Sequence, residues 1–80
     1  MMKQDELLAF LQKAVNEVIG ENSIVLTPKT KLSGLSITSF AMIQLICYVE
    51  DHFDIEIPNS EIRSFRTVKN ILDYLGKRVP

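Results

Sequence analysis

The sequence predicts an all-α fold: a small four-helix bundle of three longer helices and one short helix, with a long loop between the first two. Apolar residues recur at helical spacing in three stretches, and prolines and small polar residues separate those stretches. The one alternating segment, Ile55–Ile57, is too short and isolated to pair as a strand. A chain of 80 residues predicts one domain, 1–80.

Composition excludes several classes of protein. A hydrophobic content of 46% is too high for a disordered chain, and a formal net charge of −1 gives no basic footprint for nucleic acid. No apolar run approaches the roughly 20 residues that span a membrane. One cysteine and one histidine are too few ligands for an ordinary zinc site, so we expect no metal. The lack of a signal-peptide pattern and of an internal disulfide predicts a cytoplasmic protein.

The first helix is expected over residues 4–19, followed by a long loop over residues 21–38. The helical spacing of the apolar residues leaves Gln12 on the outer face, and Gly20 is a plausible C-cap. The loop contains Pro28 and scattered small polar residues. Its apolar residues are expected to fold back onto the core: Ile24, Val25, Leu26, Leu32, Leu35 and Ile37.

The second helix should begin near Ser39 and end near Phe53 or Asp54. Leu45, Val49 and Phe53 form a core stripe at a spacing of four residues, flanked by Met42 and Ile46.

Pro58 stops any longer helix, and two shorter helices should follow it. Asn59 can cap a brief helix over residues 60–64. Thr67 can cap another that ends at Gly76.

The first half of the second helix has too few polar residues for an ordinary surface helix. Phe40, Ile43 and Cys47 lie off the core stripe and form a second apolar face. Two interpretations remain open: this face is a docking surface for another protein, or the long loop covers it. The docking interpretation assigns partner contacts to Thr38, Phe40, Ile43, Gln44 and Cys47.

Ser39, at the head of this helix, also has two interpretations. Serine at a helix start is usually an N-cap. A chemical role would need outside help, because His52 lies roughly 20 Å further along the same helix and cannot act as its base.

The chain resembles an acyl carrier protein from about residue 4 to residue 76. The resemblance rests on these short motifs: Gly34-Leu35, Thr38-Ser39-Phe40, Leu45, Glu50, Phe53-Asp54, Ile57-Pro58, and Thr67-Val68 with Ile71. It implies that Ser39 carries a covalent 4′-phosphopantetheine, added by a separate phosphopantetheinyl transferase. It also implies a monomeric carrier, not an enzyme, whose partners are an adenylating enzyme that loads acyl or aminoacyl groups and downstream acyl-transfer enzymes.

Two departures from the family pattern affect the finer interpretation. The usual Asp-Ser-Leu is Thr38-Ser39-Phe40 here, and Ala41, Ile43 and Gln44 stand where fatty-acid carriers often have acids. Electrostatic steering by this helix should therefore be weak. We prefer a stand-alone acyl or peptidyl carrier in a secondary-metabolite or aminoacyl-transfer pathway. The alternatives are the housekeeping carrier of fatty-acid synthesis and an unmodified helical adaptor.

Two further groups of residues have provisional roles. Ile46, Ile62 and Phe65 are candidates to line a cleft for the carried chain. Arg63, Arg66 and Lys69 could pair with the acids near the end of the second helix or could meet a partner, and the sequence leaves both possibilities open.

Overall fold

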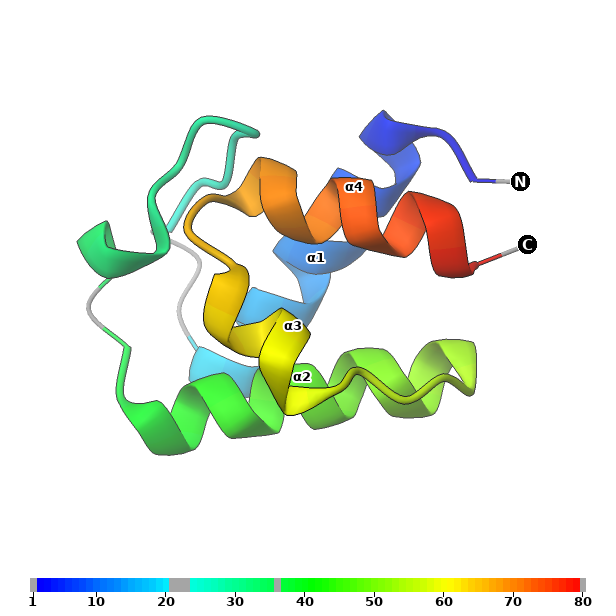
Figure 1. The fold of residues 1–80 in the computed structure, drawn as a ribbon. Coiled ribbons are helices and arrows are strands. Elements are labelled where there is room, and N and C mark those ends of the chain that lie inside the picture. The colour runs from blue at the N-terminus through cyan, green and yellow to red at the C-terminus, as the bar shows by residue number, and fades with distance from the viewer. Residues whose placement is uncertain (1, 21–23, 36, 80) are drawn as a thin grey trace.

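The computed structural model describes residues 2–20, 24–35 and 37–79. It contains four α-helices and one 3-10 turn (Figure 1): α1 (Gln4–Ile19), η1 (Leu32–Gly34), α2 (Ser39–Phe53), α3 (Asn59–Ser64) and α4 (Val68–Arg78). Within those three ranges the only β pairing is one isolated bridge. The predicted all-α class, with three longer helices and one short one, is confirmed. Parts of the predicted loop, at residues 21–23 and 36, lie outside the described residues.

The core lies where α1 packs against α2 and α4. In Figure 1, α2 runs along one side of the molecule and α4 along the other, with α3 in front of α1. Leu11 and Val15 of α1, Val49 of α2 and Leu72 of α4 are each at most 2% exposed. The other buried apolar residues are Leu7, Ala14, Leu26, Leu45, Ile46, Ile57, Phe65, Val68, Ile71, Leu75 and Val79.

Aromatic rings join α1 to the second half of α2. The ring of Phe10 lies 4.4 Å from that of His52 and 4.8 Å from that of Phe53, measured between centroids. The Tyr48 hydroxyl donates to Glu17 of α1 at 3.4 Å. These contacts fix one end of α2 on α1.

The long loop is anchored to α1 through a side chain. Gln12 Nε2 donates to the Ile24 carbonyl at 2.7 Å, and Gln12 Oε1 accepts from the Leu26 N–H at 2.8 Å. The assignment of Gln12 to the outer face is therefore wrong, because its amide satisfies the backbone of the loop. Leu26 is buried as expected, but Val25 points out and is 74% exposed.

Glu50 accepts hydrogen bonds from the backbone of the segment that follows α2. Asp54 ends the helix in the left-handed region, at φ 55°, and its N–H bonds the Glu50 carbonyl. The Glu50 carboxylate accepts from the Ile57 N–H at 2.8 Å. Ile57 is only 5% exposed, so this hydrogen bond holds the returning chain where it contributes to the core.

The boundaries of the last two helices differ partly from expectation. Thr67 does cap α4: its side chain accepts from the Asn70 N–H, and Asn70 Oδ1 accepts from the Thr67 N–H. The Asn59 cap is wrong, because Asn59 is the first helical residue and Pro58 precedes it without a side-chain bond. The predicted stop at Gly76 is also wrong, because α4 continues to Arg78.

Replacing Gly76 tests this extension of α4. A Cβ built at Gly76 meets no atom within 4 Å, and Val79 beyond it is 4% exposed. Gly76→Ala should therefore stabilise the fold by roughly 0.5–1 kcal/mol, because glycine inside a helix is entropically costly. Urea unfolding measures the change. A loss of stability would instead indicate a left-handed helix end at this position.

Candidate functional site

Ser39 is the first residue of α2, and it is exposed. The cap before it is Thr38, whose Oγ1 accepts from the Ala41 N–H at 3.0 Å. The interpretation of Ser39 as the N-cap is therefore wrong. Because Thr38 closes the helix, the Ser39 hydroxyl is left outside the capping bond and open to solvent.

The electrostatic environment of Ser39 favours a negatively charged group bound next to its hydroxyl. The first turn of α2 holds no acid, and the peptide dipoles of a helix place partial positive charge at its N-terminus. A phosphate joined to the Ser39 hydroxyl would lie at this end of a 15-residue helix. The residues present thus fit a phosphate-linked group in both reactivity and charge.

Two hollows meet beside Ser39. The first, which we call the serine-side hollow, has a volume of about 450 Å³ and is lined by Leu32, Ser33, Leu35, Ile37, Thr38, Ser39, Met42 and Ile43. The second, the inter-helix hollow, lies between α2 and α3 with a volume of about 330 Å³. Its lining residues are Met42, Ile43, Ile46, Cys47, Glu50, Ile57, Asn59 and Ile62. Met42 and Ile43 line both, so the two hollows adjoin.

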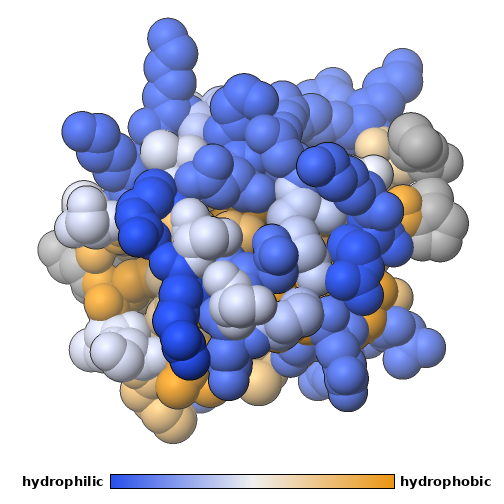
Figure 2. All heavy atoms as spheres, in the orientation of Figure 1, coloured by the Kyte–Doolittle hydropathy of each residue, from blue (hydrophilic) through white to orange (hydrophobic). Residues whose placement is uncertain are grey.

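The second apolar face of α2 is uncovered in the structure. Phe40 is 69% exposed and Ile43 is 60% exposed. Gln44 and Cys47 are exposed too, contrary to the usual burial of a mid-helix cysteine. Figure 2 shows apolar surface gathered at the lower left of this face, where α2 begins in Figure 1. The described part of the loop therefore leaves Phe40 and Ile43 accessible.

The three cleft candidates do not come together. Ile46 of α2 and Ile62 of α3 both line the inter-helix hollow. Phe65 is 8% exposed and packs edge-on against Tyr74, with ring centroids 5.8 Å apart. It lines a different hollow, on α3 and α4. Sequence reasoning missed Met42, although its i+3 spacing from Ser39 would place it beneath that serine on the same helix face.

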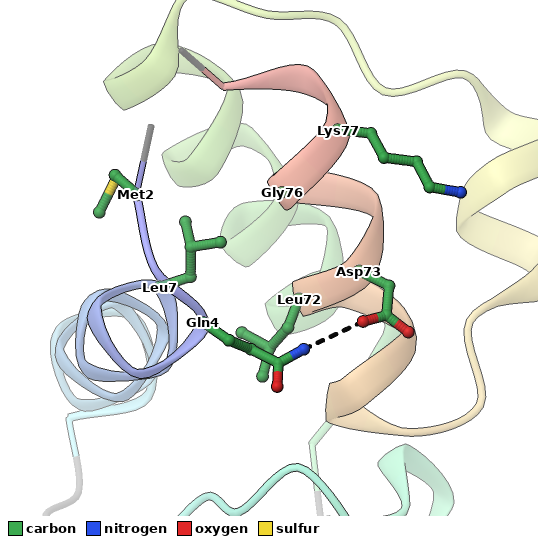
Figure 3. A pocket seen from close by; sticks show the side chains of 7 residues that line it. All are labelled: Met2, Gln4, Leu7, Leu72, Asp73, Gly76 and Lys77. Carbon is green, nitrogen blue, oxygen red and sulfur yellow. Dashed lines mark hydrogen bonds between the residues drawn. The ribbon is translucent and has the colours of Figure 1, made fainter.

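Another hollow, of about 290 Å³, lies between the start of α1 and α4 (Figure 3). Gln4 Nε2 donates across it to Asp73 Oδ1 at 3.0 Å, beside the apolar side chains of Leu7 and Leu72. It lies near the chain termini, away from the start of α2 (Figure 1), and it brings together no nucleophile and base. Over the described ranges, no group of His, Cys, Asp and Glu could hold a metal ion.

Known proteins resemble this chain over nearly its whole length. The family model for a phosphopantetheine attachment site matches residues 9–75. An acyl carrier protein of Kocuria rhizophila is 33% identical, covering 94% of each chain. A meromycolate extension acyl carrier protein of Mycolicibacterium smegmatis is 31% identical over 92% of this chain and 76% of the relative.

A solved structure agrees with these sequence matches. The holo acyl carrier protein of Geobacter metallireducens superposes with a TM-score of 0.79 at 27% identity, covering 88% of this chain and 82% of that one. The match supports the all-helical arrangement of four α-helices among the described residues. The chain therefore belongs to the acyl carrier protein family, whose members are carriers with a phosphopantetheine prosthetic group and not enzymes.

Proposed function

We propose that Ser39 carries the 4′-phosphopantetheine arm and that the protein shuttles acyl or aminoacyl groups between partner enzymes. The observation that carries this proposal is the position of the Ser39 hydroxyl. It is exposed, it lies outside the capping bond made by Thr38, and it lines the serine-side hollow at a helix N-terminus. When bound, the arm supplies a thiol that holds the cargo as a thioester.

The chain positions Ser39 but does not activate it. His52 is thirteen residues along α2, roughly 20 Å away at 1.5 Å per residue, and it is stacked on Phe10. A transferase must therefore supply the base that removes the hydroxyl proton. The apolar side chains of Met42 and Ile43, shared by the two hollows, are placed to shelter a cargo near Ser39.

Mass spectrometry of the intact protein tests the carrier proposal. The chain should gain the mass of one phosphopantetheine group when it is incubated with coenzyme A and a transferase of the source organism. Boiled transferase is the control. A chain that none of those transferases modifies would be an unmodified adaptor with the carrier fold.

We further propose that the cargo belongs to a specialised pathway. The support is the chemistry of α2, which carries exposed Phe40 and Ile43 and no acid in its first turn. A fatty-acid synthesis enzyme whose docking patch is basic would find no acid on this helix between Ser39 and Val49. An adenylating enzyme remains the expected loader, and a cytoplasmic location and a monomeric state remain predictions from the sequence. The structure has no helix of membrane-spanning length among its described residues.

The rate at which a malonyl group is transferred to the holo-protein tests the proposal that the cargo belongs to a specialised pathway. The holo-protein should accept the malonyl group from a fatty-acid synthesis transacylase at least about 10-fold more slowly than a fatty-acid carrier does, because α2 has no acid before Glu50. Equal rates for the two carriers would support the housekeeping alternative instead.

A further inference from the structure

The charges of this chain are segregated along the sequence. From Asn22 to Val49 there is no acidic residue, and the only charges are Lys29 and Lys31. Four acids then follow near the end of α2, over residues 50–56. The segment over residues 22–49, which contains Ser39, is thus cationic, although the whole chain has a formal net charge of −1.

The fold adds more cations to the two loop lysines. Three backbone hydrogen bonds of 2.9 Å join the loop to the start of α4: Leu32 N to Arg66 O, Val68 N to Thr30 O, and Lys69 N to Pro28 O. Lys31 and Thr67 form the antiparallel bridge within this pairing. The pairing places Lys29 and Lys31 beside Arg66 and Lys69, and all four side chains are exposed. We call these four residues the cationic cluster.

Little negative charge offsets the cationic cluster within the described residues. Lys69 pairs with Asp73 at 3.1 Å, one turn along α4. The Arg66 guanidinium donates to the backbone carbonyls of Arg63 and Phe65. The acids at the end of α2 lie at the opposite end of the molecule (Figure 1). Among the described residues no ion pair joins Arg63, Arg66 or Lys69 to those acids, so that possibility is wrong.

One residue of the cationic cluster, Lys31, adjoins the site at Ser39 along the chain. Lys31 directly precedes Leu32, which lines the serine-side hollow together with Ser39. An enzyme that reaches the Ser39 hydroxyl must cover the mouth of this hollow, so its surface also passes over the neighbouring loop. Ile43, which is 60% exposed, lines the same hollow from the α2 side.

Given the assignment of Ser39, we propose that the cationic cluster receives an acidic surface of the phosphopantetheinyl transferase that modifies this chain. Charge complementarity identifies the partner surface: exposed lysine and arginine favour carboxylates, and the attraction raises the association rate. The transferase seats apolar residues on Phe40 and Ile43 and acidic residues on Lys29 and Lys31. Fatty-acid carriers present acids on the second helix to their enzymes. In this chain, cations on the loop take that role toward the transferase.

Charge reversal of the two loop lysines tests the proposal. The double variant Lys29→Glu/Lys31→Glu keeps the loop pairing, because those hydrogen bonds use backbone atoms of Pro28, Thr30 and Leu32. With the transferase that modifies the wild-type chain, its kcat/KM should fall about 10-fold or more at low salt. The difference should shrink to within about 3-fold near 1 M NaCl, where the Debye length is about 3 Å.

The matched control is Lys13→Glu/Lys77→Glu, which lowers the net charge equally at exposed positions on α1 and α4. It should change kcat/KM less than about 2-fold, since neither lysine belongs to the cationic cluster or lines the serine-side hollow. Equal losses in both double variants, or wild-type rates in the loop variant, would overturn the proposal while leaving Ser39 as the attachment site. If no transferase modifies the wild-type chain, both the role of the cationic cluster and the attachment of the arm at Ser39 are contradicted.

Discussion

Ser39→Ala should take up no phosphopantetheine from any transferase that modifies the wild-type protein. The substitution removes the only atom proposed to bond the arm. Its free energy of unfolding should change by less than about 0.5 kcal/mol, because the side chain is exposed and the capping bond of α2 belongs to Thr38. Intact-mass measurement and urea unfolding give the two values.

Two neighbouring hydroxyls serve as controls. Ser33 lines the same hollow as Ser39 and is also exposed, so Ser33→Ala should be modified completely. Thr38→Ala should still be modified but lose about 0.5–2 kcal/mol of stability, since it removes the N-cap. A Ser39→Ala variant that still gains the arm, or a Ser33→Ala variant that does not, would show that the attachment site is elsewhere.

Phe40→Ala should slow transfer by partner enzymes about 10-fold or more and leave the fold nearly unchanged. Truncation of a central aromatic residue in an interface commonly costs 2 kcal/mol or more of binding energy, roughly. Phe40 is 69% exposed, so its loss removes little from the core. Single-turnover kinetics with the modifying transferase measures the first effect, and a thermal melt measures the second.

Phe65 is the matched control for Phe40. It is the same residue type but 8% exposed, so Phe65→Ala should destabilise the fold by about 3–5 kcal/mol. If Phe40→Ala lost that much stability, Phe40 would belong to the core. If it stayed stable and transferred normally, the apolar face of α2 would have no part in docking.

Much of the fold could be predicted because it depends on local patterns. The apolar periods of α1 and α2 placed their bounds within about one residue, as helical spacing allows. Gly20 ends α1 in the left-handed region at φ 77°, and Thr67 caps α4, both through short-range chemistry. The second apolar face of α2 also followed from the residue pattern, but the pattern left open whether the loop covers it, and the structure shows Phe40 and Ile43 exposed.

The remaining features depend on tertiary partners that the local sequence does not reveal. Gln12 looks like a surface residue until the loop presents the Ile24 carbonyl and Leu26 N–H to its amide. Glu50 looks like one of several solvated acids until the chain returns with the Ile57 N–H. Gly76 looks like a helix stop, but burial of Val79 against the core extends α4 past it.

In the candidate site too, some features follow from the local sequence and others depend on tertiary contacts. The position of Ser39 at the head of α2 and the apolar face of that helix could be predicted because both follow from one continuous helical pattern. The hollows could not, because they form between α2 and either η1 or α3. Phe65 was misplaced for this reason: its position after α3 gave no sign that its ring packs against Tyr74 of α4.

Fragmentation of the modified peptide tests the attachment at Ser39 most directly. The wild-type protein is loaded with the arm, digested, and the peptide spanning residues 32–63 is fragmented between adjacent residues. The added mass should appear in every fragment that contains Ser39 and in none that ends at Thr38 or begins at Phe40. Added mass on a fragment without Ser39, such as one carrying Ser33 or Cys47, would contradict the assignment.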